Sequence, residues 1–448
     1  MNNFNLLGHK GLLGSRARRL FGGAAVEYVW VSAGTYAMYA AMFGVTVLVN
    51  RAYGTVELGR FGIAWAAAQL TVQSSVSGFS ALHRRDVAMS IRPVSELVAD
   101  TLGVRLVALS MLLAVVGATA LVMPFPLELR IAVGAVTVAK AVEAIGLAFA
   151  ETLQANGQNR IYALLSVANA ASLLVSVAGI WLLGLDAIFI YPAIGMASVV
   201  YVAAAGLAYS RVFSIPSVHL NADRMKAALV ESWPLMLNAV VFVVVGRAAI
   251  LAVGILAGEA EAGVYTFAAG VVGGMSVVAS AIGTVLFPEL CATFSRNPAS
   301  LRLRMYGLVR SLGLMGLGAT AVLVAVRPLV LAMYGDLPAS APSVLLALGV
   351  GLVPLFASVA PNYMFTAIGQ QREGLLVAVL NGAVLLVLVL PLTAWYGATG
   401  AAAGVSAAQA VMAVVTVIWL DRRHLRPFTH VIARSTSDCP RVEAETPL

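Results

Sequence analysis

The sequence contains few charged residues for its length. Asp, Glu, Lys and Arg make up 11% of its 448 residues, whereas hydrophobic residues make up 60%. A water-soluble domain needs a largely charged and polar surface, and one core cannot hold so much apolar side-chain area. The composition therefore excludes a soluble globular protein and indicates a membrane protein.

Sequence patterns of enzymes and metal sites are also missing. There is no GxxxxGK[ST], HExxH or GxSxG pattern, and the two cysteines, Cys291 and Cys439, form no CxxC pair. The segments between apolar runs are too short to form a soluble domain. We therefore expect a protein that is not an enzyme, with no cofactor and no metal, whose function takes place inside the membrane.

Long apolar runs occupy most of the chain. Crossing a bilayer takes about 20 apolar residues, and twelve runs of this length are present: 26–49, 61–82, 102–123, 131–154, 162–183, 188–209, 233–257, 264–288, 306–326, 343–368, 375–396 and 401–420. They do not alternate as barrel strands do. The sequence predicts an all-α integral membrane protein with about twelve transmembrane helices. Pro354 and Pro361 predict a kink in the tenth, with carbonyls freed toward a cavity.

Basic residues lie mostly on one side of these spans. Most of the 28 Lys and Arg fall on the side shared by both termini, which predicts cytoplasmic termini. We therefore expect a multi-pass membrane protein with both termini in the cytoplasm. The net charge of +8 fits contact with anionic lipids, and no soluble basic face indicates nucleic acid. The predicted segments are a basic N-terminus (1–25), an N-lobe (26–209), a linker (210–232), a C-lobe (233–420) and a tail (421–448).

Two motifs occur twice. GTVELGRF at 54–61 and GEAEAGVY at 258–265 share G-x-x-E-x-G-x-[FY] at an offset of 204, and GQNR at 157–160 matches GQQR at 369–372 at an offset of 212. This predicts two six-helix lobes related as parallel repeats, with a central cavity between them. The repeated acids, Glu57 and Glu261, either brace the turns or contact a substrate.

The segment between the repeats contains a polar and apolar alternation. In PSVHLNADRMKAALVE (216–231), apolar residues recur at helical spacing. It is either an interfacial amphipathic helix that links two rigid bodies or an ordinary loop.

Arg247 lies inside the apolar run FVVVGRAAILAVG at 242–254. A charge on the lipid-facing side of a mid-membrane helix costs at least a few kcal/mol. Arg247 should therefore face a wet cavity or a buried acid. A guanidinium presents a planar fork of donors that suits phosphate oxygens. The alternatives are a substrate contact or a structural pair with Glu143.

Further polar residues fall within other spans. Lys140 and Glu143 lie near the middle of the fourth span, three residues apart, and can pair with each other. Gln73 belongs to a polar stripe on the second span, which either bonds neighbouring helices or contacts a ligand. The candidate binding residues are Arg247, Lys140, Glu143, Gln73 and Asn238. Arg310 is expected at the cytoplasmic mouth.

Five features of the sequence together resemble the Wzx-type polysaccharide flippase family. They are ESWPLMLN, Arg247, EAGVY, LFPEL (286–290) and MYGDLPASAPSVLLALG (333–349). This family belongs to the multidrug/oligosaccharidyl-lipid/polysaccharide exporter (MOP) superfamily. The resemblance extends from about residue 20 to 425. It implies two lobes around a cationic cavity, and a basic residue at the position of Arg247. The acidic residue that often follows it in the family is replaced here by Ala248, Ala249 and Ile250.

The resemblance implies transport of a polyprenyl-pyrophosphate-linked oligosaccharide from the cytoplasmic to the periplasmic leaflet, by alternating access, for exopolysaccharide biosynthesis. Its expected partners are this glycan, membrane lipids and the polysaccharide polymerase machinery. One alternative is a cation-coupled multidrug antiporter of the same superfamily, which needs membrane-embedded carboxylates such as Glu143. Another is a membrane scaffold for glycan assembly, which has little need of mid-membrane charges.

Overall fold

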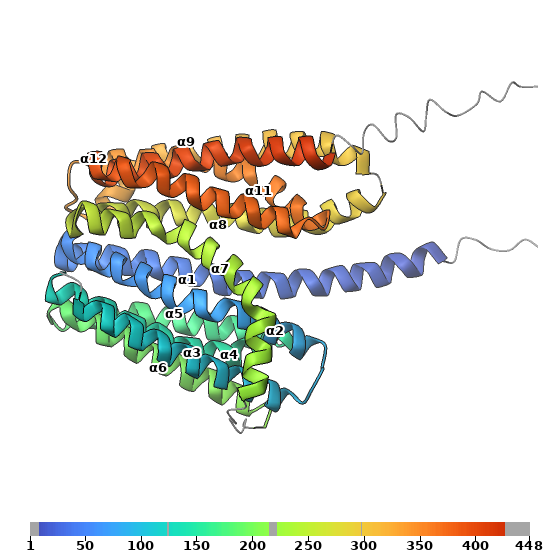
Figure 1. The fold of residues 1–448 in the computed structure, drawn as a ribbon, viewed down its shortest axis with the longest axis horizontal. Coiled ribbons are helices and arrows are strands. Elements are labelled where there is room, and N and C mark those ends of the chain that lie inside the picture. Colours follow the sequence, from blue (N-terminus) through green and yellow to red (C-terminus); the bar gives the residue numbers. More distant parts are fainter. Residues whose placement is uncertain (1–8, 123–124, 215–221, 297, 426–448) are drawn as a thin grey trace, which may run out of the picture. The chain divides into compact units, whose positions relative to one another are not determined.

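The computed structural model describes residues 9–122, 125–214, 222–296 and 298–425, and within them the regular structure is helical (Figure 1). The long helices are α1 (His9–Ala68), α2 (Ser74–Ala88), α3 (Val94–Val122), α4 (Leu127–Ala155), α5 (Asn159–Leu182), α6 (Ile190–Ser210), α7 (Ala222–Leu256), α8 (Glu259–Arg296), α9 (Pro298–Tyr334), α10 (Ala341–Val350), α11 (Leu352–Ala367) and α12 (Gln371–Leu420). Short turns η1 (Gln69–Gln73), η2 (Ala187–Phe189) and η3 (Asp421–Leu425) complete them. The predicted all-α membrane fold is confirmed.

Ten helical stretches of the described residues are long and apolar enough to cross a membrane. Two of them, Trp30–Gln73 with 44 residues and Gln371–Leu425 with 55 residues, are about twice as long as one crossing needs. Each is interrupted by a glycine with non-helical angles, Gly54 (φ 85°) in α1 and Gly397 (φ 58°) in α12. Each long stretch therefore holds two of the predicted spans, and ten stretches account for twelve spans.

The predicted kink of the tenth span lies at Gly351, between α10 and α11. Pro354 has no N–H for the carbonyl of Val350, four residues earlier, which explains why α10 ends there. Nearby carbonyls are taken up by side chains of neighbouring helices: Thr320 donates to Gly349 at 2.8 Å and Ser406 to Ala347 at 2.6 Å. These two carbonyls are therefore bonded within the bundle next to the kink.

The GQxR motifs form two turns with the same geometry. Gly157 and Gly369 adopt positive φ angles of 81° and 76°. The following Gln158 and Gln370 each donate a backbone N–H, at 2.8 Å, to the residue five positions earlier. This is the pattern of a helix end closed by a left-handed glycine. The two turns support the sequence repeat.

The other repeated motif brings its two copies into close contact. Gly54 and Gly258 begin the copies, with positive φ angles of 85° and 90°. Five residues later in each copy, a Cβ on Gly59 would lie 1.8 Å from the carbonyl oxygen of Glu259, and a Cβ on Gly263 would lie 2.0 Å from that of Thr55. Thr55 and Glu259 are themselves equivalent positions of the repeat. The contact is therefore reciprocal, and it excludes any side chain at either of the two glycines.

The repeated acids brace this end of the bundle. Glu57 forms an ion pair with Arg60, which also donates from Nε to Glu259 at 2.7 Å. Glu261 accepts the backbone N–H of Ala398 at 2.9 Å, directly after the kink of α12. These contacts match the bracing role that was one of the two interpretations of the acids.

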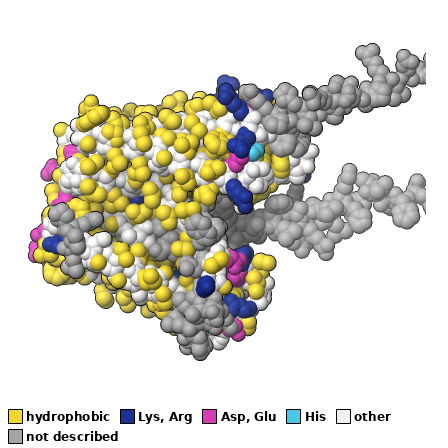
Figure 2. Space-filling model, in the orientation of Figure 1, with side chains coloured by type: hydrophobic (Ala, Val, Ile, Leu, Met, Phe, Trp, Pro, Cys, Tyr) yellow, Lys and Arg dark blue, Asp and Glu magenta, His cyan; other side chains and the backbone are white. Residues whose placement is uncertain are grey.

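The chain divides into two compact units: unit 1 comprises residues 1–52 and 64–243, and unit 2 comprises 53–63 and 244–448. Each has its own buried core, which includes Leu102, Ala148 and Tyr209 in unit 1 and Leu290 and Met364 in unit 2. The outward helix faces carry large apolar side chains, and charged ones gather near helix ends (Figure 2). Such surfaces suit a surrounding bilayer.

The linker prediction falls partly outside the described residues, which omit 215–221. From Ala222 onward the chain is helical and continues without a break as α7, so the helix is not separate from the seventh span. Within unit 1, Glu231 of this helix accepts from Arg85 at 2.8 Å. The start of α7 is therefore tied to the end of α2.

Candidate functional site

The middle of α4 carries a charged pair in unit 1. Lys140 donates from Nζ to Glu143 Oε2 at 2.6 Å, as the spacing of three residues predicted. The ammonium also lies 4.0 Å from the ring centroid of Trp65, within range of a cation–π interaction. Asn169 of α5 donates from Nδ2 to Glu143 Oε1 at 3.1 Å. Four side chains from three helices thus form one polar group, which we call the Lys140 cluster.

The Lys140 cluster is only partly closed off. The side chains of Lys140 and Glu143 are 12% and 21% exposed. A charge pair that keeps some exposure inside a membrane bundle indicates local hydration, because hydrocarbon would leave it unsolvated. Glu143 neutralises Lys140 locally, so the pair presents a strong dipole with little net charge. Such a group can hydrogen-bond a polar ligand, and it attracts anions less than a free lysine would.

A second charged pair joins α3 to α4 and was missed in the sequence analysis. Arg105 of α3 donates from Nη2 to Glu151 of α4 at 2.6 Å, and both side chains are buried, at 0% and 5% exposure. The guanidinium also donates to the hydroxyl of Ser80 and to the carbonyl of Ala144, both at 2.8 Å. We call this the Arg105 network. The signal was available: Arg105 is a charge one turn inside a predicted span.

Polar contacts extend next to this network. His83 contacts Thr152 through Nε2 at 2.7 Å and Thr101 through Nδ1 at 2.9 Å. These bonds join α2, α3 and α4. Because buried polar groups are retained only when they are bonded, the arrangement fixes how the three helices pack.

Arg247 lies in α7, in the part that belongs to unit 2, and its side chain is partly buried. It lies near Tyr265 of α8 in the same unit, and it is not an isolated charge. Glu143, the acid that the sequence offered as a partner, is paired with Lys140. The position of Arg247 deep in a span still requires a polar environment.

The remaining predicted residues lie apart from these groups. Gln73 ends the π-helical turn η1 and is exposed. Arg310 is exposed on α9. The side chain of Asn238 lies outside the described residues. In the part of the chain that is described, no three His, Cys, Asp or Glu residues are grouped to hold a metal ion.

Comparisons with known proteins give one family match and several structures with a similar fold. Residues 131–340 match the family model described as "Polysaccharide biosynthesis protein". The fold resembles an inward-facing multidrug resistance MATE family transporter of the MOP superfamily, with a TM-score of 0.68, 17% identity, and coverage of 90% of this chain and 99% of that one. It also resembles the lipid II flippase MurJ in an inward closed conformation, with a TM-score of 0.66, 12% identity, and coverage of 91% of each chain.

A third similar structure is a MOP superfamily transporter from Pyrococcus furiosus, with a TM-score of 0.59, 16% identity, and coverage of 89% of this chain and 94% of that one. A comparison with curated protein sequences gave no match. The chain therefore has the fold of MOP superfamily transporters. The family match at residues 131–340 and these shared folds agree with the resemblance to polysaccharide flippases that the sequence motifs indicated.

Proposed function

We propose that this protein transports a polyprenyl-pyrophosphate-linked oligosaccharide from the cytoplasmic to the periplasmic leaflet of the bacterial inner membrane, for exopolysaccharide biosynthesis. The observation that carries the proposal is the family match at residues 131–340 on a fold shared with a lipid II flippase. A polysaccharide biosynthesis family and the fold of a lipid flippase both fit one substrate class, a sugar attached to a lipid. The polymerase machinery is the proposed downstream partner.

In this proposal, Arg247 contacts the pyrophosphate. Its guanidinium can donate two parallel hydrogen bonds to phosphate oxygens, while the prenyl chain stays in the lipid. Binding must be weak enough for release after the headgroup is carried across by alternating access. The Lys140 cluster contributes hydrogen bonds to the polar part of the substrate, with Glu143 limiting the positive charge. Gln73, Asn238 and Arg310 remain proposed contacts of secondary importance.

The direct test is transport in proteoliposomes. The purified protein is reconstituted with a fluorescent lipid-linked oligosaccharide, and the label on the outer leaflet is quenched over time. Protein-dependent transfer between leaflets supports the proposal. Liposomes with protein that transfer no more label than empty ones contradict it.

The phosphate contact predicts different effects of two substitutions. Arg247→Ala removes the charge and should lower the transfer rate at least tenfold, which corresponds to about 1.4 kcal/mol. Arg247→Lys retains the charge and loses the planar fork, so it should recover only part of the rate. Transfer at the wild-type rate by Arg247→Lys would rule out a bidentate contact.

The second candidate function is cation-coupled export of drugs. It is favoured by the partial exposure of Glu143 and by the fold shared with a multidrug resistance transporter. Such an antiporter needs a carboxylate that exchanges cations, whereas Glu143 is engaged by Lys140 and Asn169. In a deletion strain, the flippase proposal expects loss of polymer with lipid-linked units retained inside. Unchanged polymer with greater sensitivity to cationic drugs would favour the antiporter.

A further inference from the structure

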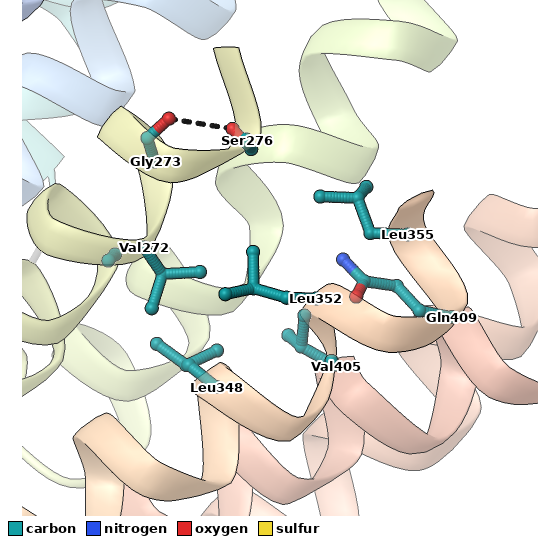
Figure 3. Close-up of a pocket in the computed structure, with 10 residues that line it drawn as sticks. Val272, Gly273, Ser276, Leu348, Leu352, Leu355, Val405 and Gln409 are labelled. Atoms are coloured by element: carbon teal, nitrogen blue, oxygen red, sulfur yellow. Dashed lines mark hydrogen bonds between the residues drawn. The ribbon is translucent and has the colours of Figure 1, made fainter. Parts of the chain in front are cut away.

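Unit 2 contains an apolar pocket of 170 Å³ that is partly open (Figure 3). Helices α8, α10, α11 and α12 line it, mainly through Val272, Leu348, Leu352, Leu355 and Val405. The ten residues that line it include no charged side chain. The pocket is therefore suited to a hydrocarbon group rather than to the charged part of a substrate.

Gly273 of α8 makes room for this pocket. A Cβ at Gly273 would meet no atom within 4 Å, and its φ angle is not in the left-handed region. Neither of the usual reasons for glycine, a positive φ or a close backbone contact, applies here. A glycine inside a helix costs about 1 kcal/mol relative to alanine. The space in front of Gly273 is thus left open where a side chain would have been tolerated.

The polar groups at the pocket leave its apolar character intact. Ser276 donates its hydroxyl to the carbonyl of Gly273 at 2.7 Å, so this hydroxyl is satisfied within its own helix. The Gln409 amide lies at one side of the pocket (Figure 3). An apolar cavity of about 150 Å³ in a soluble protein stays dry and binds benzene. A pocket of 170 Å³ therefore accommodates a group of similar size, such as a branched five-carbon isoprene unit.

We propose that this pocket binds one isoprene unit of the substrate's prenyl chain, beyond the two units next to the pyrophosphate, and so makes transport depend on chain length. The inference rests on the proposed function, which supplies a branched hydrocarbon chain attached to a polar headgroup. The helices that line the pocket belong to stretches long and apolar enough to cross a membrane, and a bilayer surrounds such stretches with hydrocarbon chains. Because the pocket is partly open, the rest of the chain can remain outside it.

Two adjacent glycines provide a matched test. Gly273→Leu fills the pocket, whereas Gly274→Leu adds the same side chain at a neighbouring position that is exposed and outside the pocket lining. A Cβ at Gly274 also meets nothing within 4 Å. Both substitutions raise helix propensity equally. Any difference between the two variants therefore comes from the pocket.

The assay uses two fluorescent pyrophosphate-linked sugars with the same headgroup, one on a long prenyl chain and one on a chain of two isoprene units. We expect the wild type to transfer the long-chain substrate about tenfold faster, because burying several methylenes can supply such a difference. Gly273→Leu should lower the long-chain rate to near the short-chain rate. Gly274→Leu should stay within about twofold of the wild type. Gly273→Ala, which fills less space, should be intermediate.

The outcomes separate the two proposals. If the wild type transfers neither substrate, the proposed function fails, and the pocket proposal falls with it. If the wild type transfers both at equal rates, or if Gly273→Leu and Gly274→Leu discriminate equally well between the chains, the pocket proposal alone is overturned. Thermal unfolding in detergent shows whether each variant is folded. If Gly273→Leu is not folded, Gly273→Ala decides by the same criterion.

Discussion

Helix α4 contributes the acid of two ion pairs, which have the same N–O distance of 2.6 Å and different surroundings. Glu151 pairs with Arg105 on another helix, and both side chains are buried. Glu143 pairs with Lys140 on its own helix, and both remain partly exposed. The distance is therefore no guide to the role. A pair that joins two helices in a closed interior fixes their packing, whereas a local and partly open pair leaves its side chains accessible.

The largest expected effect comes from breaking the buried pair. Arg105→Leu leaves the Glu151 carboxylate buried without its cation, which should cost about 3–5 kcal/mol of stability. Thermal unfolding in detergent and the yield of folded protein measure this loss. The double variant Arg105→Leu and Glu151→Leu should recover most of it, because no unpaired charge remains. A single variant as stable as the wild type would show that the pair does not fix the packing.

A smaller loss of stability is expected from the partly open pair. Lys140→Met removes a local ion pair and a cation–π contact, which together should cost about 1–2 kcal/mol. Glu143 retains its hydrogen bond from Asn169. Transfer of the lipid-linked substrate should fall at least tenfold, a larger effect than the change in stability explains. Transfer unchanged in a folded Lys140→Met protein would mean that the cluster is structural, like the Arg105 network.

The smallest effect is expected at the aromatic partner. Trp65→Phe keeps a ring beneath the Lys140 ammonium and weakens the cation–π interaction, at a cost of about 0.5–1 kcal/mol. Trp65→Leu removes the ring entirely and should cost more, with a larger drop in transport. Comparing the two by thermal unfolding and by transfer rate shows how far the aromatic ring positions the ammonium. Equal behaviour of both variants would indicate that Trp65 acts only through its volume.

Hydropathy was sufficient to predict the spans, because a bilayer requires about 20 apolar residues in each crossing. The two repeated motifs were also visible in the sequence, and the structure places a left-handed glycine in each copy, at Gly54, Gly157, Gly258 and Gly369. The pairing of Lys140 with Glu143 followed from their spacing alone. Hydropathy and residue spacing were therefore enough to predict the helices and the contact between Lys140 and Glu143.

The Arg105 network could not be derived in the same way. Arg105 lies one turn inside its span, where a long side chain often extends to the membrane surface. Only the packing of α3 against α4 shows that it points inward, to an acid 46 residues away. The pocket at Gly273 was equally hidden, since a glycine in a helix does not reveal whether its neighbouring space is filled.

The reciprocal contact of Gly59 and Gly263 has the geometry of an isologous dimer, in which the same residue is used once by each partner. A single six-span chain carrying this motif would make the contact with a second copy of itself. In the present chain, Arg60 is matched in the second motif by Val264, and Thr55 by Glu259. Arg60 therefore pairs with Glu259, whereas the equivalent residues, Val264 and Thr55, cannot form an ion pair. The two copies of the motif are thus equivalent in their backbone contact at Gly59 and Gly263, and they differ in the charged side chains beside it.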